Sequence, residues 1–278
     1  MARVTGCRFP IRHQCRNTIG VLIDSEPPAH FHYRNVAKTE FMVISSRQKM
    51  QSLNDNTINV NVEGVKINQT DHSKAHGLNM DENLSWKEHI HAASKKVASS
   101  IGALKRVRSF ISMHIAIKIY KGLIEPHFDY CSVVWDGLSQ QLCEKLQKLQ
   151  NRAARVITKS SYNTNSSYLL NPLSWDNLSV RRTKQKVNLT YKCVNKLAPN
   201  YLCNMFTPRT LPFDLRDARQ KLYLPKPRTD YLKRSFSYSG ASLWNDLPED
   251  IRTTNSLRNF KRRIDKWLSV SDSHTANM

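Results

Sequence analysis

Acidic side chains are scarce in this sequence. Its 278 residues include 22 Asp and Glu against 43 Lys and Arg, which gives a formal net charge of +21 and a pI near 9.9. Such a charge predicts a polyanionic partner, either nucleic acid or an acidic membrane surface. The alternative is a basic surface that only keeps the chain soluble. Because 40% of the residues are hydrophobic, the chain can build a sizeable core, and disorder throughout is disfavoured.

Long apolar runs and paired cysteines are missing, and glycine is scarce. No stretch approaches the roughly 20 apolar residues of a membrane-spanning helix. The 8 glycines form no phosphate-binding loop, and no GxSxG or HExxH motif is present. None of the 6 cysteines lies in a CxxC pair, so we expect reduced thiols. Cys131, Cys143 and Cys193 lie in apolar helical contexts and are expected to be small core residues.

The N-terminal residues carry no apolar segment of the kind found in secretory signals. We therefore expect a protein of the cytoplasm or the nucleus, without choosing between them, and not a secreted one. The first 23 residues hold four arginines and no acid before Asp24, which leaves a mitochondrial presequence as an alternative. Pro10 and Gly20 interrupt that segment and argue against it.

The chain has no adjacent aspartates. Metal-assisted phosphoryl transfer needs carboxylates that hold divalent ions about 3.5–4 Å apart. The consecutive acids are Asp81-Glu82 and Glu249-Asp250, and both pairs lie near expected helix starts, where acids interact favourably with the helix dipole. We therefore predict no catalytic residue, no metal site, no cofactor and no small-molecule substrate in this chain.

The residues before Trp86 predict a few short strands. Residues 1–37 show no regular pattern. KTEFMVIS, at 38–45, has the length and apolar character of a strand. TINVNVEGVKI, at 57–67, alternates and has a turn signal at its Glu-Gly pair, which predicts a β-hairpin. Gly77–Asp81 is expected to form one more short strand.

After Trp86, apolar residues recur with the period of a helix. Ser85 and Glu88 have the spacing of a capping box at the start of the first helix, and Pro126 ends the second. The expected helices cover about Trp86–Val107, His114–Glu125, Ser139–Lys159, Asp176–Leu197 and Ser256–Leu268.

The third of these helices carries two stripes. In LCEKLQKLQNRAARVITK, at 142–159, five cations step by three and four residues from Lys145 to Lys159, and apolar residues step in the same way from Leu142 to Val156. At about 100° per residue, the basic stripe lies about 60° from the apolar stripe. We therefore predict a helix that docks on a core and presents its cations along one rim of that contact.

The positive charge is concentrated in the predicted helices. Residues 86–200 contain 19 Lys and Arg and 6 Asp and Glu. The cations thus belong to a folded surface, which favours a shaped site over a polybasic membrane anchor. A solvated face that serves solubility is the alternative. The candidate nucleic-acid-binding residues are Lys95, Lys96, Lys105, Arg106, Lys145, Lys148, Arg152, Arg155 and Lys159.

A succession of motifs resembles one family. KTEFMVISSRQKM, NVEGVKI and LNMDENLSWKEHI are similar, in this order, to the post-catalytic segment of reverse transcriptases from non-LTR retrotransposons of the jockey and chicken-repeat type. The resemblance covers about Lys38 to Leu268. It continues through KKVASSIGALKRVRSF, YKGLIEPHFDYCSVVW, LQKLQNRAARVIT, LSWDNLSVRRTKQKVNLTYKCVNKLAPNYL and LPKPRTDYLKRSFSYSGASLWNDLP.

The resemblance implies a fold and a role for the basic helices. The expected fold class is mainly α, a thumb-like helical bundle with a small N-terminal β-hairpin element left over from a palm. In this family the thumb grips the primer–template with Lys and Arg on helix faces, and the palm binds Mg²⁺ through an Asp-Asp turn just upstream of the KTEF-like strand. Residues 1–37 contain no Asp-Asp pair. Asn79 is a polar departure from the family's pattern at what would be a primer-contacting hairpin.

These observations divide the chain and define an expected function. We expect a truncated fragment of a retrotransposon RNA-directed DNA polymerase that lacks the catalytic Asp-Asp. It would retain at most nonspecific binding to the RNA or DNA backbone of a primer–template, with no membrane partner and an undefined oligomeric state. Two alternatives stay open: a polymerase active only when a palm is supplied upstream or in trans, and a non-functional gene-model relic. The expected segments are 1–37 (unrelated or disordered), 38–85 (residual palm strands), 86–200 (basic thumb-like helices), 201–240 (Pro-rich, irregular connector), 241–270 (helical tail) and 271–278 (disordered).

Overall fold

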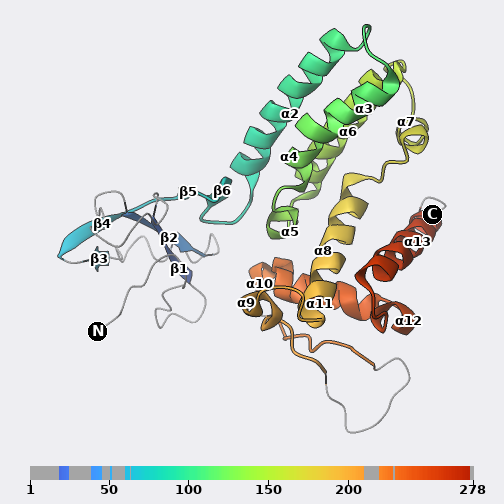
Figure 1. Cartoon of the computed structure of the whole chain (residues 1–278). Helices are drawn as coiled ribbons and strands as arrows, with labels where there is room; N and C mark the ends of the chain where they lie inside the picture. Colours follow the sequence, from blue (N-terminus) through green and yellow to red (C-terminus); the bar gives the residue numbers. More distant parts are fainter. Residues whose placement is uncertain are drawn as a thin grey trace. The chain divides into compact units, whose positions relative to one another are not determined.

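The computed structural model describes residues 19–24, 39–45, 51, 60–62, 64–209, 219–227 and 229–275. The chain divides into two compact units, residues 1–93 and 94–278. The strands of the described residues lie in the first unit, and the helices from α3 onward lie in the second (Figure 1). The prediction of a mainly α protein with a small N-terminal β element is confirmed.

The first unit contains a four-stranded sheet with the order β1-β2-β4-β3. The predicted strand at 38–45 is β2, and the predicted hairpin forms β3 and β4, with Gly64 at φ +81° in the turn. Phe41, Met42, Val43 and Ile67 are buried by this unit. The strands are Ile19–Asp24 (β1), Thr39–Ile44 (β2), Val60–Val62 (β3) and Val65–Gln69 (β4).

β1 lies within residues 1–37, which showed no regular pattern in the sequence, so the expectation of disorder does not hold for residues 19–24, while that of a segment unrelated to the family stays a prediction. β1 pairs antiparallel with β2 along its whole length, from Ile19 opposite Ile44 to Asp24 opposite Thr39. Its sequence, IGVLID, is an apolar run of strand length like that of β2, so a local signal for this strand was present and was overlooked.

A second, two-stranded sheet leads into the helices. β5 (His72–Ala75) and β6 (Leu78–Asp81) pair across a turn in which His76 and Gly77 both have positive φ, as a tight hairpin turn requires. The predicted strand at Gly77–Asp81 corresponds to β6, whereas the polar sequence of β5 had hidden it.

The start of the first helix is capped differently from the prediction. The Asp81 carboxylate accepts hydrogen bonds from the backbone N–H groups of Ser85 (2.9 Å) and Trp86 (3.0 Å). The N–H of Ser85 thus donates to Asp81 and not to the Glu88 side chain, so the predicted capping box is wrong. The Ser85 hydroxyl still accepts from the N–H of Lys87 at 3.4 Å. The Asp81 carboxylate, four residues before Ser85, caps the start of the helix instead.

The long helices of the second unit confirm most of the predicted segments. α6 begins after Ser139 and ends at Lys159, whose φ of +57° is a left-handed cap, as the expected bounds of 139–159 required. The second predicted helix is split at Ile124, because Pro126 opens a new helical turn there. The elements are α2 (Lys87–Val107), α3 (Met113–Leu123), α4 (Glu125–Asp129), α5 (Ser132–Trp135), α6 (Gln140–Thr158), α7 (Ser166–Leu170), η2 (Asn171–Leu173) and α8 (Leu178–Val194).

The C-terminal part folds onto α8. Tyr191 of α8 packs on Phe260, with ring centroids 4.2 Å apart, and its hydroxyl donates to the Thr254 carbonyl at 2.9 Å. Trp244, fully buried beside them, donates its indole N–H to the Gln220 carbonyl at 2.7 Å. The elements are α9 (Asn200–Cys203), α10 (Asp230–Arg234), α11 (Phe236–Asp246), α12 (Glu249–Arg252) and α13 (Leu257–Thr275).

Two segment predictions need correction here. The stretch 201–240, expected to be irregular, includes α10 and the first turns of α11. α13 continues to Thr275, so its last residues lie in the segment 271–278 that was expected to be disordered. α11 escaped sequence reasoning because its serines and Gly240 are weak helix formers. Tertiary packing stabilises it, and a Cβ at Gly240 would lie 2.8 Å from the Thr190 hydroxyl.

The cysteines within the second unit are free thiols. Cys193, on α8, is buried in the hydrophobic core of the unit, as predicted, and Cys143 is half-buried. Cys131 is exposed, with a left-handed φ of +51° at the start of α5, so the prediction of a core residue was wrong for it. None of the helices within the described residues has both the length and the apolar character needed to cross a membrane.

Candidate nucleic-acid interface

The cations of α6 lie on its solvent face. The buried residues of this helix are Leu146, Gln150, Ala153, Ala154 and Ile157. Positions two residues apart differ by about 200° around a helix. Lys148 and Arg152 each stand two positions from Gln150. The basic row is thus nearly opposite the core, and the predicted position at the rim of the contact was wrong.

A buried amide causes this difference. Gln150 is 2% exposed, and its Nε2 donates to the Asp176 carbonyl at 3.0 Å while its Oε1 accepts from Gln147 at 2.7 Å. Gln147 in turn accepts from the backbone N–H of Leu178 at the start of α8. Because these bonds satisfy the amide, Gln150 can be buried. The core face therefore centres on Gln150 and Ile157 instead of the predicted Leu149 and Val156.

The α6 cations differ in how they are held. Lys145, Lys148, Arg152 and Lys159 are exposed, and none of the carboxylates that the structure describes forms an ion pair with them. Arg155 is half-buried. Its guanidinium lies 5.6 Å from the centroid of the Tyr162 ring and donates to the Thr164 carbonyl at 3.4 Å. Four cations thus face water, and the fifth fastens the loop after the helix.

Acids are scarce in the sequence around this row, where the exposed Glu144 directly precedes Lys145 on α6. Residues 89–124 and 145–175 together hold twelve Lys and Arg and no Asp or Glu. These two stretches include most of α2, all of α3 and most of α6. A polyanion that approaches the face of α6 therefore meets little opposing charge from the helices next to it in sequence or packed on it.

The predicted cations of α2 do not form one row. Lys95, Lys96, Lys105 and Arg106 are all exposed. Lys96 and Lys105 are nine positions apart, which places them about 180° from each other around the helix. Lys95 and Arg106 share the outward face, since eleven positions bring them within about 20°. The structure thus groups the candidate residues of α6 on one face and distributes those of α2 over three.

Four of the five cations of α8, in contrast, are bound to carboxylates. Arg181 contacts Glu125 at 2.9 Å and Asp129 at 2.6 Å, and the hydrogen bond that it donates to Asp129 is the main cause that raises the pKa of Arg181. Arg182 and Lys186, both buried, pair with Asp136 at 2.7 and 2.5 Å. Lys184 joins Asp176 at 2.7 Å and Asp265 of α13 at 2.9 Å. These cations hold helices together and are not available to a ligand.

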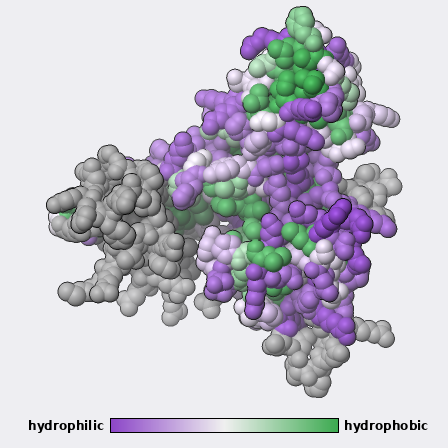
Figure 2. Space-filling view, in the orientation of Figure 1, coloured by the Kyte–Doolittle hydropathy of each residue, from purple (hydrophilic) through white to green (hydrophobic). Residues whose placement is uncertain are grey.

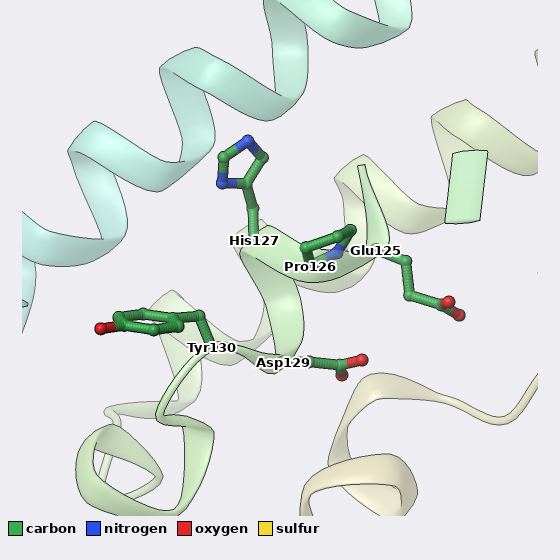
Figure 3. A pocket seen from close by; sticks show the side chains of 5 residues that line it. All are labelled: Glu125, Pro126, His127, Asp129 and Tyr130. Carbon is green, nitrogen blue, oxygen red and sulfur yellow. The ribbon is translucent and has the colours of Figure 1, made fainter. Parts of the chain in front are cut away.

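A shallow depression of about 520 Å³ lies over α4 (Figure 3). Glu125 and Asp129 point to the same side of the helix, while His127 points toward α2 and Tyr130 to another side. Burial, followed by the charge of Lys96, lowers the pKa of His127. The two carboxylates converge on Arg181, as described above. No group of three His, Cys, Asp or Glu side chains that could hold a metal ion occurs within the described part of the chain.

Two known proteins are similar to part of this chain. The probable RNA-directed DNA polymerase from transposon BS of Drosophila melanogaster is 24% identical over 116 residues, which is 41% of this chain and 13% of that protein. The probable RNA-directed DNA polymerase from transposon X-element of the same organism is 26% identical over 102 residues, which is 36% of this chain and 11% of that protein. The matches thus span only about a tenth of the length of these curated relatives.

No family model matches the chain, and no solved structure is similar to it. The assignment rests on the similarity to the two transposon proteins. The chain is therefore reverse transcriptase-like and of transposon-related origin.

Proposed function

We propose that this chain binds the backbone of RNA or DNA without sequence preference, through the solvent face of α6. The observation that carries the proposal is a row of exposed cations without carboxylate partners among the described residues: Lys145, Lys148, Arg152 and Lys159. In this proposal the chain corresponds to the thumb and tail of a jockey-like, non-LTR reverse transcriptase, the part that follows the palm and holds the primer–template.

The dimensions of the row suit a phosphate backbone. Lys145 and Lys159 are fourteen residues apart, so the row extends about 21 Å along the helix. A strand of B-DNA places one phosphate about every 3.4 Å, and several phosphates therefore fall within reach of four long side chains. Contacts of this kind position a duplex and carry no sequence information. Binding also breaks no ion pair within the protein, because these cations have no carboxylate partner among the described residues.

The test is a charge reversal with a matched control. Lys145→Glu/Lys148→Glu/Arg152→Glu is compared with Arg258→Glu/Lys261→Glu/Arg262→Glu on the exposed face of α13, since both variants change the net charge equally. Binding to a labelled duplex is measured by fluorescence anisotropy between about 50 and 200 mM salt. We expect the α6 variant to lose about 100-fold in affinity and about 2.7 in the slope of log K against log salt. Equal losses of affinity in both variants would show that the α6 row is a solvated face that serves only solubility.

We propose further that the chain does not polymerise DNA alone. The paired carboxylates at α4 are bonded to Arg181 and, in this proposal, the Mg²⁺-binding acids of the family lie in a palm. A primer-extension assay with Mg²⁺ and the purified chain is expected to give no product. Incorporation would overturn this part of the proposal. It would favour the alternative of an active polymerase.

The remaining alternative is a relic without a selected role. A folded protein with the α8 core described above is expected to unfold in one cooperative thermal transition, followed by circular dichroism. A gradual loss of signal without a transition would favour the relic and would remove the basis for a shaped binding surface.

A further inference from the structure

Two aromatic side chains stand in solvent near the end of α6. Phe110, in the turn between α2 and α3, is 86% exposed, and Tyr162, in the loop after α6, is 87% exposed. No other large hydrophobic side chain that the structure describes is as exposed as these two. Apolar rings in this position leave a large surface in contact with water, which often marks a binding site.

Both rings are held to the last turns of α6. The Arg108 guanidinium donates to the Ile157 carbonyl at 2.9 and 2.6 Å and to the Ile111 carbonyl at 2.8 Å, so the turn that carries Phe110 is fastened to α6. Arg155 holds Tyr162 through the cation–π contact described above. Figure 1 shows the α2–α3 turn and the end of α6 side by side.

The charged residues of the sequence stretches that carry these rings are all positive. Lys105 and Arg106 at the end of α2 and Lys159 at the end of α6 are exposed, and the acid-free stretches 89–124 and 145–175 contain the whole region. Hydrophobic side chains gather over this end of the unit (Figure 2), where Val107 and Met113 are also exposed. Aromatic rings among cations are the combination that single-stranded nucleic acid requires, because bases stack on the rings and phosphates meet the cations.

We propose that Phe110 and Tyr162 form a stacking platform for the unpaired bases of a single strand, which continues from the backbone held along α6. The inference rests on the proposed function and makes it more specific: it names unpaired nucleotides as the ligand at this end of the row. Charge complementarity selects this occupant over an apolar protein surface, since the cations of α6 lead directly to the platform.

The test distinguishes the contribution of the two aromatic rings to binding from that of the positive charges. Phe110→Leu/Tyr162→Leu keeps every cation and an apolar side chain but removes both rings. The probes are a labelled oligothymidine and an abasic strand of equal length, which has the same phosphates and no bases. We expect the wild type to bind oligothymidine about tenfold more tightly than the abasic strand. The double variant is expected to bind both strands equally, with its affinity for the abasic strand unchanged.

Two controls keep the result interpretable. Tyr201→Leu removes another exposed tyrosine, 69% exposed on α9, and is expected to leave the preference intact. Tyr162→Phe keeps the ring and is expected to bind as the wild type does. Circular dichroism of each variant verifies that it is folded.

The outcomes distinguish the two proposals. If the wild type binds both strands equally and in a salt-dependent manner, stacking is overturned and backbone binding stands. If the wild type binds neither strand, the proposed function fails as well. If the double variant loses binding to vesicles of anionic lipid and keeps its preference for oligothymidine, the rings contact a membrane and the inference is overturned.

Discussion

α6 and α8 are two long helices of the same unit, and they differ in what surrounds their cations. α6 and its cap carry Lys145, Lys148, Arg152, Arg155 and Lys159, and α8 carries Arg181, Arg182, Lys184, Lys186 and Lys192. All but one of the α6 cations face water without a carboxylate partner among the described residues. On α8 the first four are ion-paired, and two of these are buried.

The comparison shows that the same number of charges can serve two purposes. On α8 each acid that accepts an ion pair comes from another element, so the cations cross-link helices. On α6 the one acid, Glu144, forms no ion pair with the row among the described residues, so the charge stays available. A buried cation that loses its partner is costly, whereas an exposed one contributes little to stability. Mutations on the two helices should therefore separate stability from binding.

The largest effect is expected at Asp136. Asp136→Asn leaves Arg182 and Lys186 buried without a counter-charge, and we expect the free energy of unfolding to fall by about 3–5 kcal/mol. Chemical denaturation measures the loss. Asp246→Asn, an exposed carboxylate on α11, serves as the control and should change little. A small loss in Asp136→Asn would show that the α8 pairs are not structural, which would break the comparison.

Two separate glycine substitutions, at Gly240 and at Gly122, test the packing of α8 against α11. Gly240→Ala places a methyl group against Thr190 of α8, 2.8 Å from its hydroxyl, and should destabilise the protein by about 1–3 kcal/mol. Gly122→Ala on α3 meets no atom within 4 Å and should stabilise it by about 0.5–1 kcal/mol. Thermal unfolding gives both values. A neutral Gly240→Ala would show that α11 can move away from α8.

Charge reversal in the α6 row should have almost no effect on the stability of the protein. Lys145→Glu/Lys148→Glu/Arg152→Glu removes no ion pair of the described residues, so we expect the free energy of unfolding to change by about 0.5 kcal/mol or less. The same variant is expected to lose most of its nucleic-acid affinity. A large loss of stability would place these cations in the structural class with those of α8.

The smallest effect concerns the pH dependence of stability. Burial and the charge of Lys96 lower the pKa of His127, so the unfolded chain binds this proton more readily than the folded one. Stability is therefore lost as the pH falls through about 6.5. His127→Gln removes this contribution, and its Tm should differ less between about pH 7.5 and 5.5 than that of the wild type. An identical pH dependence would show that His127 is fully solvated.

Local features were predicted where local chemistry controls them. The periodicity of α6 gave its bounds to within one residue, and the hairpin of β3 and β4 followed from alternation and Gly64. β1 was missed although its residues form an apolar run, and α11 was missed because its serines and Gly240 are weak helix formers and packing on α8 stabilises it. The cations of the candidate site lie on a helix with the predicted bounds, but their relation to the core differs from the prediction, since a buried glutamine moved the core face.

The sequence by itself determined the excess of positive charge, its concentration in the helices and the spacing of the α6 cations, because these depend only on composition and on the helical period. Tertiary structure alone decided which cations are free. Pairing requires a carboxylate within a few ångströms, and the acids that neutralise α8 lie as far as 81 positions away, at Asp265 relative to Lys184. Burial of Gln150 likewise depends on partners from α8 and the segment before it, and it turns the α6 row toward solvent.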